Sequence, residues 1–128
     1  SVRQVTLTRD TTLFFKTGTE SVNATAYDTP EGFIVLKGSI GQKDIASRLV
    51  GLDSRYEQRR INLQAKQHIV FDDEKMLLIE DCVFDSPSAA AATLYGGQMN
   101  GLTCWKNENG ITLKELRMKV LESMKNQS

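Results

Sequence analysis

The sequence predicts a single α+β domain in which about three helices, near residues 54–67, 86–96 and 112–125, pack against a small and mostly antiparallel sheet. Three observations lead to this fold class. Short β-type runs separated by turn signals fill the N-terminal third of the chain. A charged segment separates two more such runs further on. Later segments begin with helix-capping signals and continue with strong helix formers.

Length and composition are those of an ordinary globular domain. A chain of 128 residues can bury roughly two-thirds of the surface that its unfolded form exposes, so we expect one core across residues 1–128. Hydrophobic residues at 40% and charged residues at 25% exclude disordered and fibrous classes. No apolar run approaches the roughly 20 residues of a membrane span, and no secretory signal is visible, so we expect a soluble, cytoplasmic protein. The chain starts without Met, which suggests a domain excised from a longer protein.

Three β-type runs form the predicted N-terminal meander, at Leu13–Phe15, Ala24–Tyr27 and Phe33–Leu36. Thr-Pro-Glu-Gly at 29–32 separates the last two runs. It favours a hairpin turn, because Pro presets one dihedral and Gly tolerates positive φ. The segment 37–39 (Lys-Gly-Ser) then closes this part of the sheet with a flexible corner.

The middle of the chain predicts one helix and one hairpin. Ser54, followed three residues later by a glutamate, is a capping-box signature that starts the helix at 54–67. The apolar positions of this helix make no clean stripe, so we place it at the edge of the domain. Ile69–Phe71 and Met76–Ile79 flank the charged segment 72–75 and predict a hairpin around it.

A second helix begins at Ser86-Pro87, where the hydroxyl can accept from an orphan N–H and Pro has no N–H to satisfy. Gly96-Gly97 ends this helix with residues that can enter the left-handed region. Asn100-Gly101 is a turn signal that leads into a predicted last strand at Leu102–Lys106.

The C-terminal helix is the clearest one. Thr112 with Glu115 forms a capping box. A predicted apolar face follows at helical spacing. Its members are Leu113, Leu116, Val120, Leu121 and Met124.

Motifs for catalysis or metal binding are absent. His68 has no second histidine or cysteine pair beside it, so it is not expected to bind a metal. The acidic run 72–74 lacks the spacing of a calcium loop, so we interpret this run as a solvated turn. Cys82 and Cys104 have no metal-ligand spacing and are expected to be reduced structural thiols. The formal net charge is zero, so any anion-binding face has to be local.

One combination of segments is distinctive. It consists of Gly32-Phe33-Ile34-Val35-Leu36-Lys37-Gly38-Ser39, then Phe84-Asp85-Ser86-Pro87-Ser88-Ala89-Ala90-Ala91-Ala92, Gly97, Asn100-Gly101, Trp105-Lys106, Gly110 and Thr112-Leu113. Over roughly residues 13–122 the chain resembles the domain of unknown function found at the C-terminus of many GIY-YIG endonuclease-type proteins. Its C-terminal half is also similar to the restriction-enzyme adenine-methylase-associated (RAMA) domain, which occurs in DNA-modification systems and is proposed to read modified DNA. The GIY-YIG catalytic motif is absent, so any nuclease activity would lie outside these residues.

The resemblance implies a non-catalytic accessory domain of a DNA-processing protein, without a cofactor, whose partners are DNA and a fused or separate nuclease or methylase domain. The exposed N–H groups of a helix start, extended by serine hydroxyls, would bind a phosphate. Lysines of the other motif segments would add phosphate contacts, and Trp105 or Tyr95 would stack on an exposed base. The predicted contact residues are Lys37, Ser39, Ser86, Ser88, Asn100, Trp105 and Lys106.

The same residues also have structural interpretations. Ser86 would be an N-cap that contributes on the order of 1 kcal/mol, and Trp105 would be a core anchor. The alternative function is a protein-interaction or structural domain, which fits the zero net charge better. The sequence decides neither the form of nucleic acid nor the oligomeric state.

Overall fold

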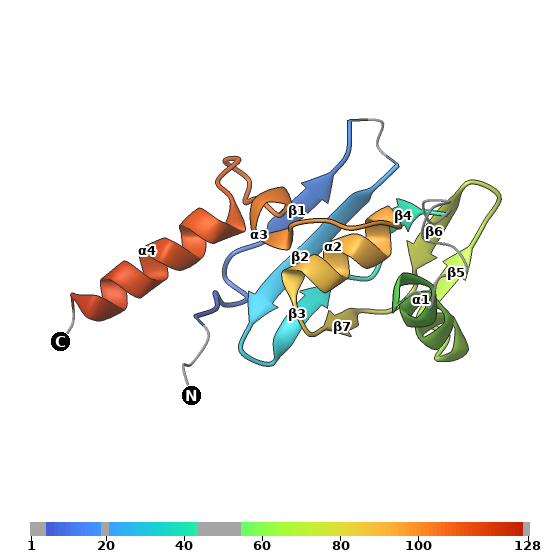
Figure 1. Cartoon of the computed structure of the whole chain (residues 1–128), viewed down its shortest axis with the longest axis horizontal. Helices are drawn as coiled ribbons and strands as arrows, with labels where there is room; N and C mark the ends of the chain where they lie inside the picture. The colour runs from blue at the N-terminus through green and yellow to red at the C-terminus, as the bar shows by residue number, and fades with distance from the viewer. Residues whose placement is uncertain (1–4, 19–20, 44–54, 127–128) are drawn as a thin grey trace.

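The computed structural model describes residues 5–18, 21–43 and 55–126. Ser54, the predicted cap of the first helix, lies outside the described residues. The secondary-structure elements run in the order β1 (Leu13–Lys16), β2 (Asn23–Thr29), β3 (Gly32–Val35), β4 (Ile40–Gln42), α1 (Arg55–Ala65), β5 (Ile69–Phe71), β6 (Lys75–Leu78), β7 (Cys82–Phe84), α2 (Pro87–Tyr95), α3 (Gly101–Cys104) and α4 (Leu113–Lys125) (Figure 1).

The seven described strands form one sheet. Its order is β5-β6-β4-β2-β3-β7, and β1 pairs with the other edge of β2. Every pairing between these strands is antiparallel. The α2 and α3 helices cover one face of the sheet, α1 lies beside its β5–β6 end, and α4 extends away from the opposite end (Figure 1). The predicted α+β class, the mostly antiparallel sheet and the three longer helices are confirmed.

The β2–β3 hairpin forms where the turn residues predict it. Gly32 has a φ of 144°, a conformation that L side chains rarely adopt, and a Cβ there would meet Val83 Cγ1 at 2.7 Å. The Thr29 hydroxyl donates to the carbonyl of Gly32 at 2.8 Å and closes the turn. Pairing then extends as far as Ala26 opposite Val35. Local turn chemistry therefore sets the register of the central strands.

The core lies between α2, α3 and one face of the sheet. Alternate residues of β1, β2 and β3 point into it, because successive side chains of a strand point to opposite faces. Trp105 is its largest buried side chain, with ring centroids 5.5 Å from Phe15 and 4.9 Å from Phe33. The alanines of α2 are buried, and their small side chains let the helix lie close to the strands.

Three parts of the chain differ from the prediction. The predicted strand at Leu102–Lys106 is wrong: residues 101–104 form α3, and only Lys106 pairs with neighbouring chain segments. The reason is that the Asn100 side chain caps a helix, accepting the amide of Leu102 at 3.0 Å, instead of forming a two-residue hairpin turn. The sequence analysis also did not predict β4, which begins directly after the 37–39 corner, or β7 at Cys82–Phe84.

Arg60 joins α1 to the rest of the domain. Its side chain is buried, and its Nε and Nη2 donate to the carbonyl of Thr93 in the last turn of α2, at 3.0 and 2.8 Å. The same guanidinium donates to the carbonyls of Gln42, the last residue of β4, and of Lys43, which follows it. A cation is favourable at this end of α2, because the unpaired carbonyls of a helix C-terminus carry partial negative charge.

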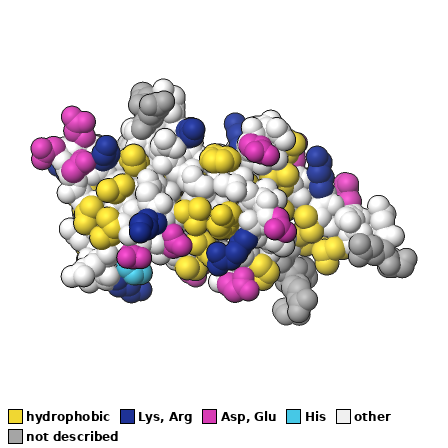
Figure 2. Space-filling model, turned by 180° about the vertical axis from the view of Figure 1, so that it is seen from behind, with side chains coloured by type: hydrophobic (Ala, Val, Ile, Leu, Met, Phe, Trp, Pro, Cys, Tyr) yellow, Lys and Arg dark blue, Asp and Glu magenta, His cyan; other side chains and the backbone are white. Residues whose placement is uncertain are grey.

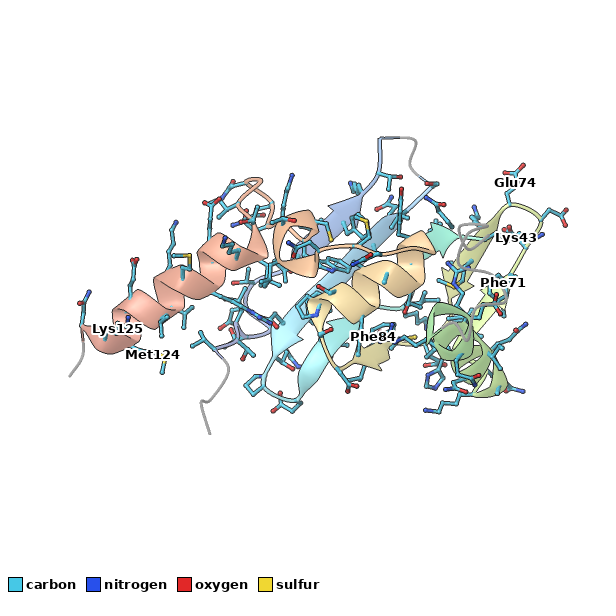
Figure 3. All side chains as sticks on the ribbon, viewed as in Figure 1. Lys43, Phe71, Glu74, Phe84, Met124 and Lys125 are labelled. Carbon is cyan, nitrogen blue, oxygen red and sulfur yellow. The ribbon has the colours of Figure 1, made fainter. Side chains whose placement is uncertain are left out.

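The α4 helix begins as predicted but buries little of its apolar face. Thr112 caps the helix by accepting the amide of Glu115. Only Leu113 is buried, whereas Leu121 is 40% and Met124 is 56% exposed. Met124 and Lys125 stand clear of the sheet at the far end of the helix (Figure 3). None of the described helices is both long and apolar enough to cross a membrane.

Candidate nucleic-acid interface

The start of α2 has the predicted capping geometry. Ser86 is extended, with φ −153° and ψ 157°, and its Oγ accepts the amide of Ala89 at 3.1 Å. Pro87 occupies the first helical turn, where an N–H would have no helical partner. At the other end of the helix, Gly96 takes the left-handed conformation and its N–H donates to the carbonyl of Ala92. Ser86 therefore has the structural role of an N-cap.

The residues of the SPS, NG and W segments hold α2 and α3 together. The amide of Gly101 donates to Ser88 Oγ at 2.9 Å, and Trp105 Nε1 donates to the carbonyl of Pro87 at 3.1 Å. A Cβ on Gly101 would lie only 2.3 Å from the carbonyl carbon of Pro87 and the nitrogen of Ser88. We call this set of contacts, between residues 86–88 and 100–105, the α2–α3 clasp. It explains why these distant segments occur together in one motif.

Trp105 is not available for base stacking. Its side chain is 0% exposed and its N–H is used inside the clasp, so no ring surface reaches the solvent. The predicted contact between Trp105 and a base is therefore wrong, and the alternative interpretation as a core anchor is confirmed. Tyr95, the other predicted stacking residue, keeps an exposed side chain at the end of α2.

The two predicted contact residues of the 37–39 corner, Lys37 and Ser39, take no part in the clasp. Ser39 is buried, and its Oγ accepts the amide of Thr25 at 3.1 Å, so its hydroxyl supports the sheet rather than a surface contact. Lys37 is exposed, and its amide donates to Asp81 Oδ1 at 2.8 Å. The preceding Leu36 lies three strand spacings from Lys106, roughly 14 Å at ~4.8 Å per strand. The predicted residues therefore divide among the clasp, the corner and the edge of β1.

Ser86 and Ser88 also line a shallow hollow of about 320 Å³. Arg59 from α1 and Gln98 border the same hollow. Each serine Oγ accepts one backbone amide within the protein, which leaves its own O–H proton as a donor. The sequence did not predict the approach of Arg59 to this place, because it depends on how α1 docks on α2.

Lys106 lies at the edge of β1, where a second hollow opens. Its backbone pairs with Phe14 in both directions, with the Phe14 amide donating at 2.7 Å and the Lys106 amide at 3.0 Å. This pairing places the Lys106 side chain on the same face of the sheet as Phe14 and Lys16. Together with Asn107, Glu108 and two further residues they line a space of about 470 Å³, which we call the β1-edge hollow.

The charge of this hollow is positive by one unit. Lys16 and Lys106 are both exposed, and Glu108 is the single acidic residue in the lining. The loop that carries Glu108 is ordered by Asn107, whose Oδ1 accepts the amides of Asn109 and Ile111 at 3.0 and 2.9 Å. Sequence reasoning selected Lys106 but missed Lys16 and Phe14. The two-residue spacing of Phe14 and Lys16 indicates that both side chains lie on one face of a strand. It does not indicate that Lys106 is the residue paired with Phe14.

A comparison with protein families finds a match that covers most of the chain. The model described as "Domain of unknown function (DUF4357)" matches residues 13–117. The chain belongs to this family. Neither the curated proteins nor the solved structures contain a match to this chain. The matched segment of this DUF4357 domain begins with β1 and ends within α4, so it includes both the clasp and the β1-edge hollow.

The cysteines of this DUF4357 domain are not activated nucleophiles. Burial raises the pKa of Cys82 to about 11, and the neighbouring Asp81 and Glu80 act in the same direction. Burial likewise raises the pKa of Cys104 to about 11. Both are free thiols that stay protonated near neutral pH, and the thiolate is the reactive form. This agrees with the prediction of reduced structural thiols.

The acidic segment of the DUF4357 domain forms the predicted turn between β5 and β6, with Glu74 at its tip (Figure 3). Asp72 Oδ1 accepts the amides of Glu74 and Lys75 at 2.8 and 2.7 Å. These two hydrogen bonds, helped by nearby lysines, lower the pKa of Asp72 below 3.8. Among the described residues, no three His, Cys, Asp or Glu side chains come together as a metal site.

The Asp72 turn leads to a prediction about pH. Because the folded-state pKa is lowered, the ionised carboxylate stabilises the fold above pH 3.8, and this contribution is lost as the pH falls through the lowered value. Asp72→Asn keeps an acceptor oxygen but removes the charge. We expect wild type to have the higher melting temperature at pH 7 and the difference to close on acidification below pH 3.8. Thermal melts of both proteins from pH 7 downward test this, and a difference that stays constant over the whole range would contradict it.

Proposed function

We propose that this DUF4357 domain is a non-catalytic accessory domain of a DNA-processing protein, of the nuclease or restriction-modification kind, and that it contacts DNA through the β1-edge hollow. The observation that carries the proposal is the approach of Lys16 and Lys106 on either side of Phe14, from segments far apart in the sequence. The resemblance to domains of GIY-YIG endonuclease-type proteins and to the RAMA domain supports the choice of DNA as the ligand.

Lysine side chains at an open edge are suited to phosphate contacts. An ammonium group neutralises a backbone phosphate and releases its condensed counterions, so affinity depends on salt and little on sequence. Such contacts position the protein on the nucleic acid without reading its bases. The non-catalytic part of the proposal is supported by the motif itself, since Ser86, Ser88 and Trp105 make contacts within the fold.

Fluorescence anisotropy with plain duplex, adenine-methylated duplex and single-stranded DNA tests the proposal. We expect binding at low salt that weakens as salt is added. In the variant Lys16→Gln/Lys106→Gln the log–log salt slope on duplex DNA should become less negative by roughly 2, because about two phosphate contacts are lost. Lys114→Gln/Lys119→Gln on α4 is the matched control, because it removes the same charge elsewhere. No binding of any DNA at low salt would refute the function, and an unchanged slope in the β1-edge variant would refute the site.

A protein-interaction domain is the second candidate, and α4 is the observation that favours it. Met118, Leu121 and Met124 expose apolar side chains along this helix. Sedimentation at high protein concentration distinguishes the two candidates, because self-association through these side chains would raise the sedimentation coefficient without DNA.

A further inference from the structure

We infer that the nucleic acid bound by this domain is single-stranded, and that its unpaired bases stack on Phe14 and Tyr27 across the uncovered face of the sheet. The inference rests on the proposed function and specifies the ligand of the same region. We call the face turned away from α2 and α3 the open face. Figure 2, which views the molecule from behind, shows this face with hydrophobic side chains in the middle and with Lys, Arg, Asp and Glu side chains among them.

The strand register places both rings on the open face. Phe14 lies opposite Thr25, and Tyr27 is two residues further along β2, so the two aromatic residues are diagonal neighbours on one face. Side chains in this relation are roughly 7–8 Å apart. Both rings are partly exposed, and Phe14 also lines the β1-edge hollow.

Each ring has a cation beside it. The Arg9 guanidinium lies over the ring of Tyr27, 5.8 Å from its centroid, so it already occupies one side of this ring. Lys106 is the direct cross-strand neighbour of Phe14, and Lys16 follows two residues along the same strand. The open face therefore carries cations at the two ends of a short aromatic row. Bases stacked on the rings would place their phosphates near these cations, which is the arrangement typical of single-strand binding surfaces.

Duplex DNA does not fit this face as well. Its bases are stacked inside the helix, so only phosphates and groove edges reach a flat sheet surface. Beyond Tyr27 the same row continues with Ile34, which is buried at 6% exposed, and with Val83, which is 62% exposed. Apolar and aromatic side chains gain nothing from facing phosphates, whereas they can pack against the flat surfaces of unpaired bases.

The test compares two probes, oligothymidylate of about 12 nucleotides and a duplex of equal length, at low salt. Wild type should bind the single strand more tightly than the duplex. Phe14→Leu and Tyr27→Leu should each weaken single-strand binding about tenfold or more, with a smaller effect on the duplex. Tyr27→Phe keeps the ring and should bind like wild type. Ile61→Ala removes an exposed aliphatic side chain from α1, outside the open face, and is the matched control.

Near-ultraviolet circular dichroism and thermal melts verify that each variant is folded, so that a lost fold is not taken for lost stacking. Duplex binding as tight as single-strand binding, or leucine variants that bind like wild type, would overturn the inference and leave the proposed function standing. An equal loss in Ile61→Ala and Tyr27→Leu would also overturn it, because the loss would then not depend on a ring of the open face. Failure to bind either probe would overturn the proposed function as well.

Discussion

Replacing Gly101 with alanine is expected to lower the free energy of unfolding by at least about 3 kcal/mol. The added Cβ would lie 2.3 Å from two backbone atoms, the Pro87 carbonyl carbon and the Ser88 nitrogen. Backbone atoms cannot rotate out of the way as a side chain can, so α2 and α3 would have to separate. Their separation would stretch two hydrogen bonds, from the Gly101 amide to Ser88 Oγ and from Trp105 Nε1 to the carbonyl of Pro87.

Urea unfolding followed by tryptophan fluorescence measures this loss, because Trp105 is the only tryptophan of the chain and lies in the core. Gly18→Ala is the matched control: a Cβ at Gly18 would meet no atom within 4 Å, so its effect should stay within about 0.5 kcal/mol. If Gly101→Ala is as stable as Gly18→Ala, the close approach of α3 to the start of α2 is not a feature of the folded protein.

Removing the partner of Asp28 is expected to have a similarly large effect. Asp28 takes a core-facing position of β2 and is only 2% exposed. Arg117 of α4 donates to both of its carboxylate oxygens, from Nε at 2.8 Å and from Nη2 at 2.7 Å. In Arg117→Met the carboxylate keeps the amide of Leu7 as a donor at 3.1 Å but loses its charged partner, so we expect the free energy of unfolding to fall by about 3 kcal/mol.

The loss of this ion pair should also loosen α4, since Leu113 is its only fully buried residue. Hydrogen exchange in the second half of α4 should therefore accelerate in Arg117→Met. Lys119→Met on the same helix is the control and should change stability by no more than about 0.5 kcal/mol. A double variant Asp28→Asn/Arg117→Met should recover part of the loss, because no buried charge is left without its partner. Strictly additive single effects would contradict the ion-pair explanation.

The sequence by itself determined the elements whose stabilising contacts are local. The caps at Ser86 and Thr112 and the turn at 29–32 each depend on hydrogen bonds between residues no more than four positions apart. The same is true of the acidic turn at Asp72. Since such contacts need no distant partner, residue type and spacing were enough to predict two of the long helices, two hairpins and the α+β class.

Only the tertiary structure decided which motif residues face the solvent. The segment at 102–106 was predicted as a strand, but it begins in a short helix that Asn100 caps. The distant contacts from Gly101 to Ser88 and from Trp105 to Pro87 hold this helix against α2 and bury the tryptophan. The same holds for the candidate interface, because Lys16 and Lys106 meet only through the pairing of Phe14 with Lys106. Such contacts join segments far apart in the chain, and their free energy depends on packing that no local pattern encodes.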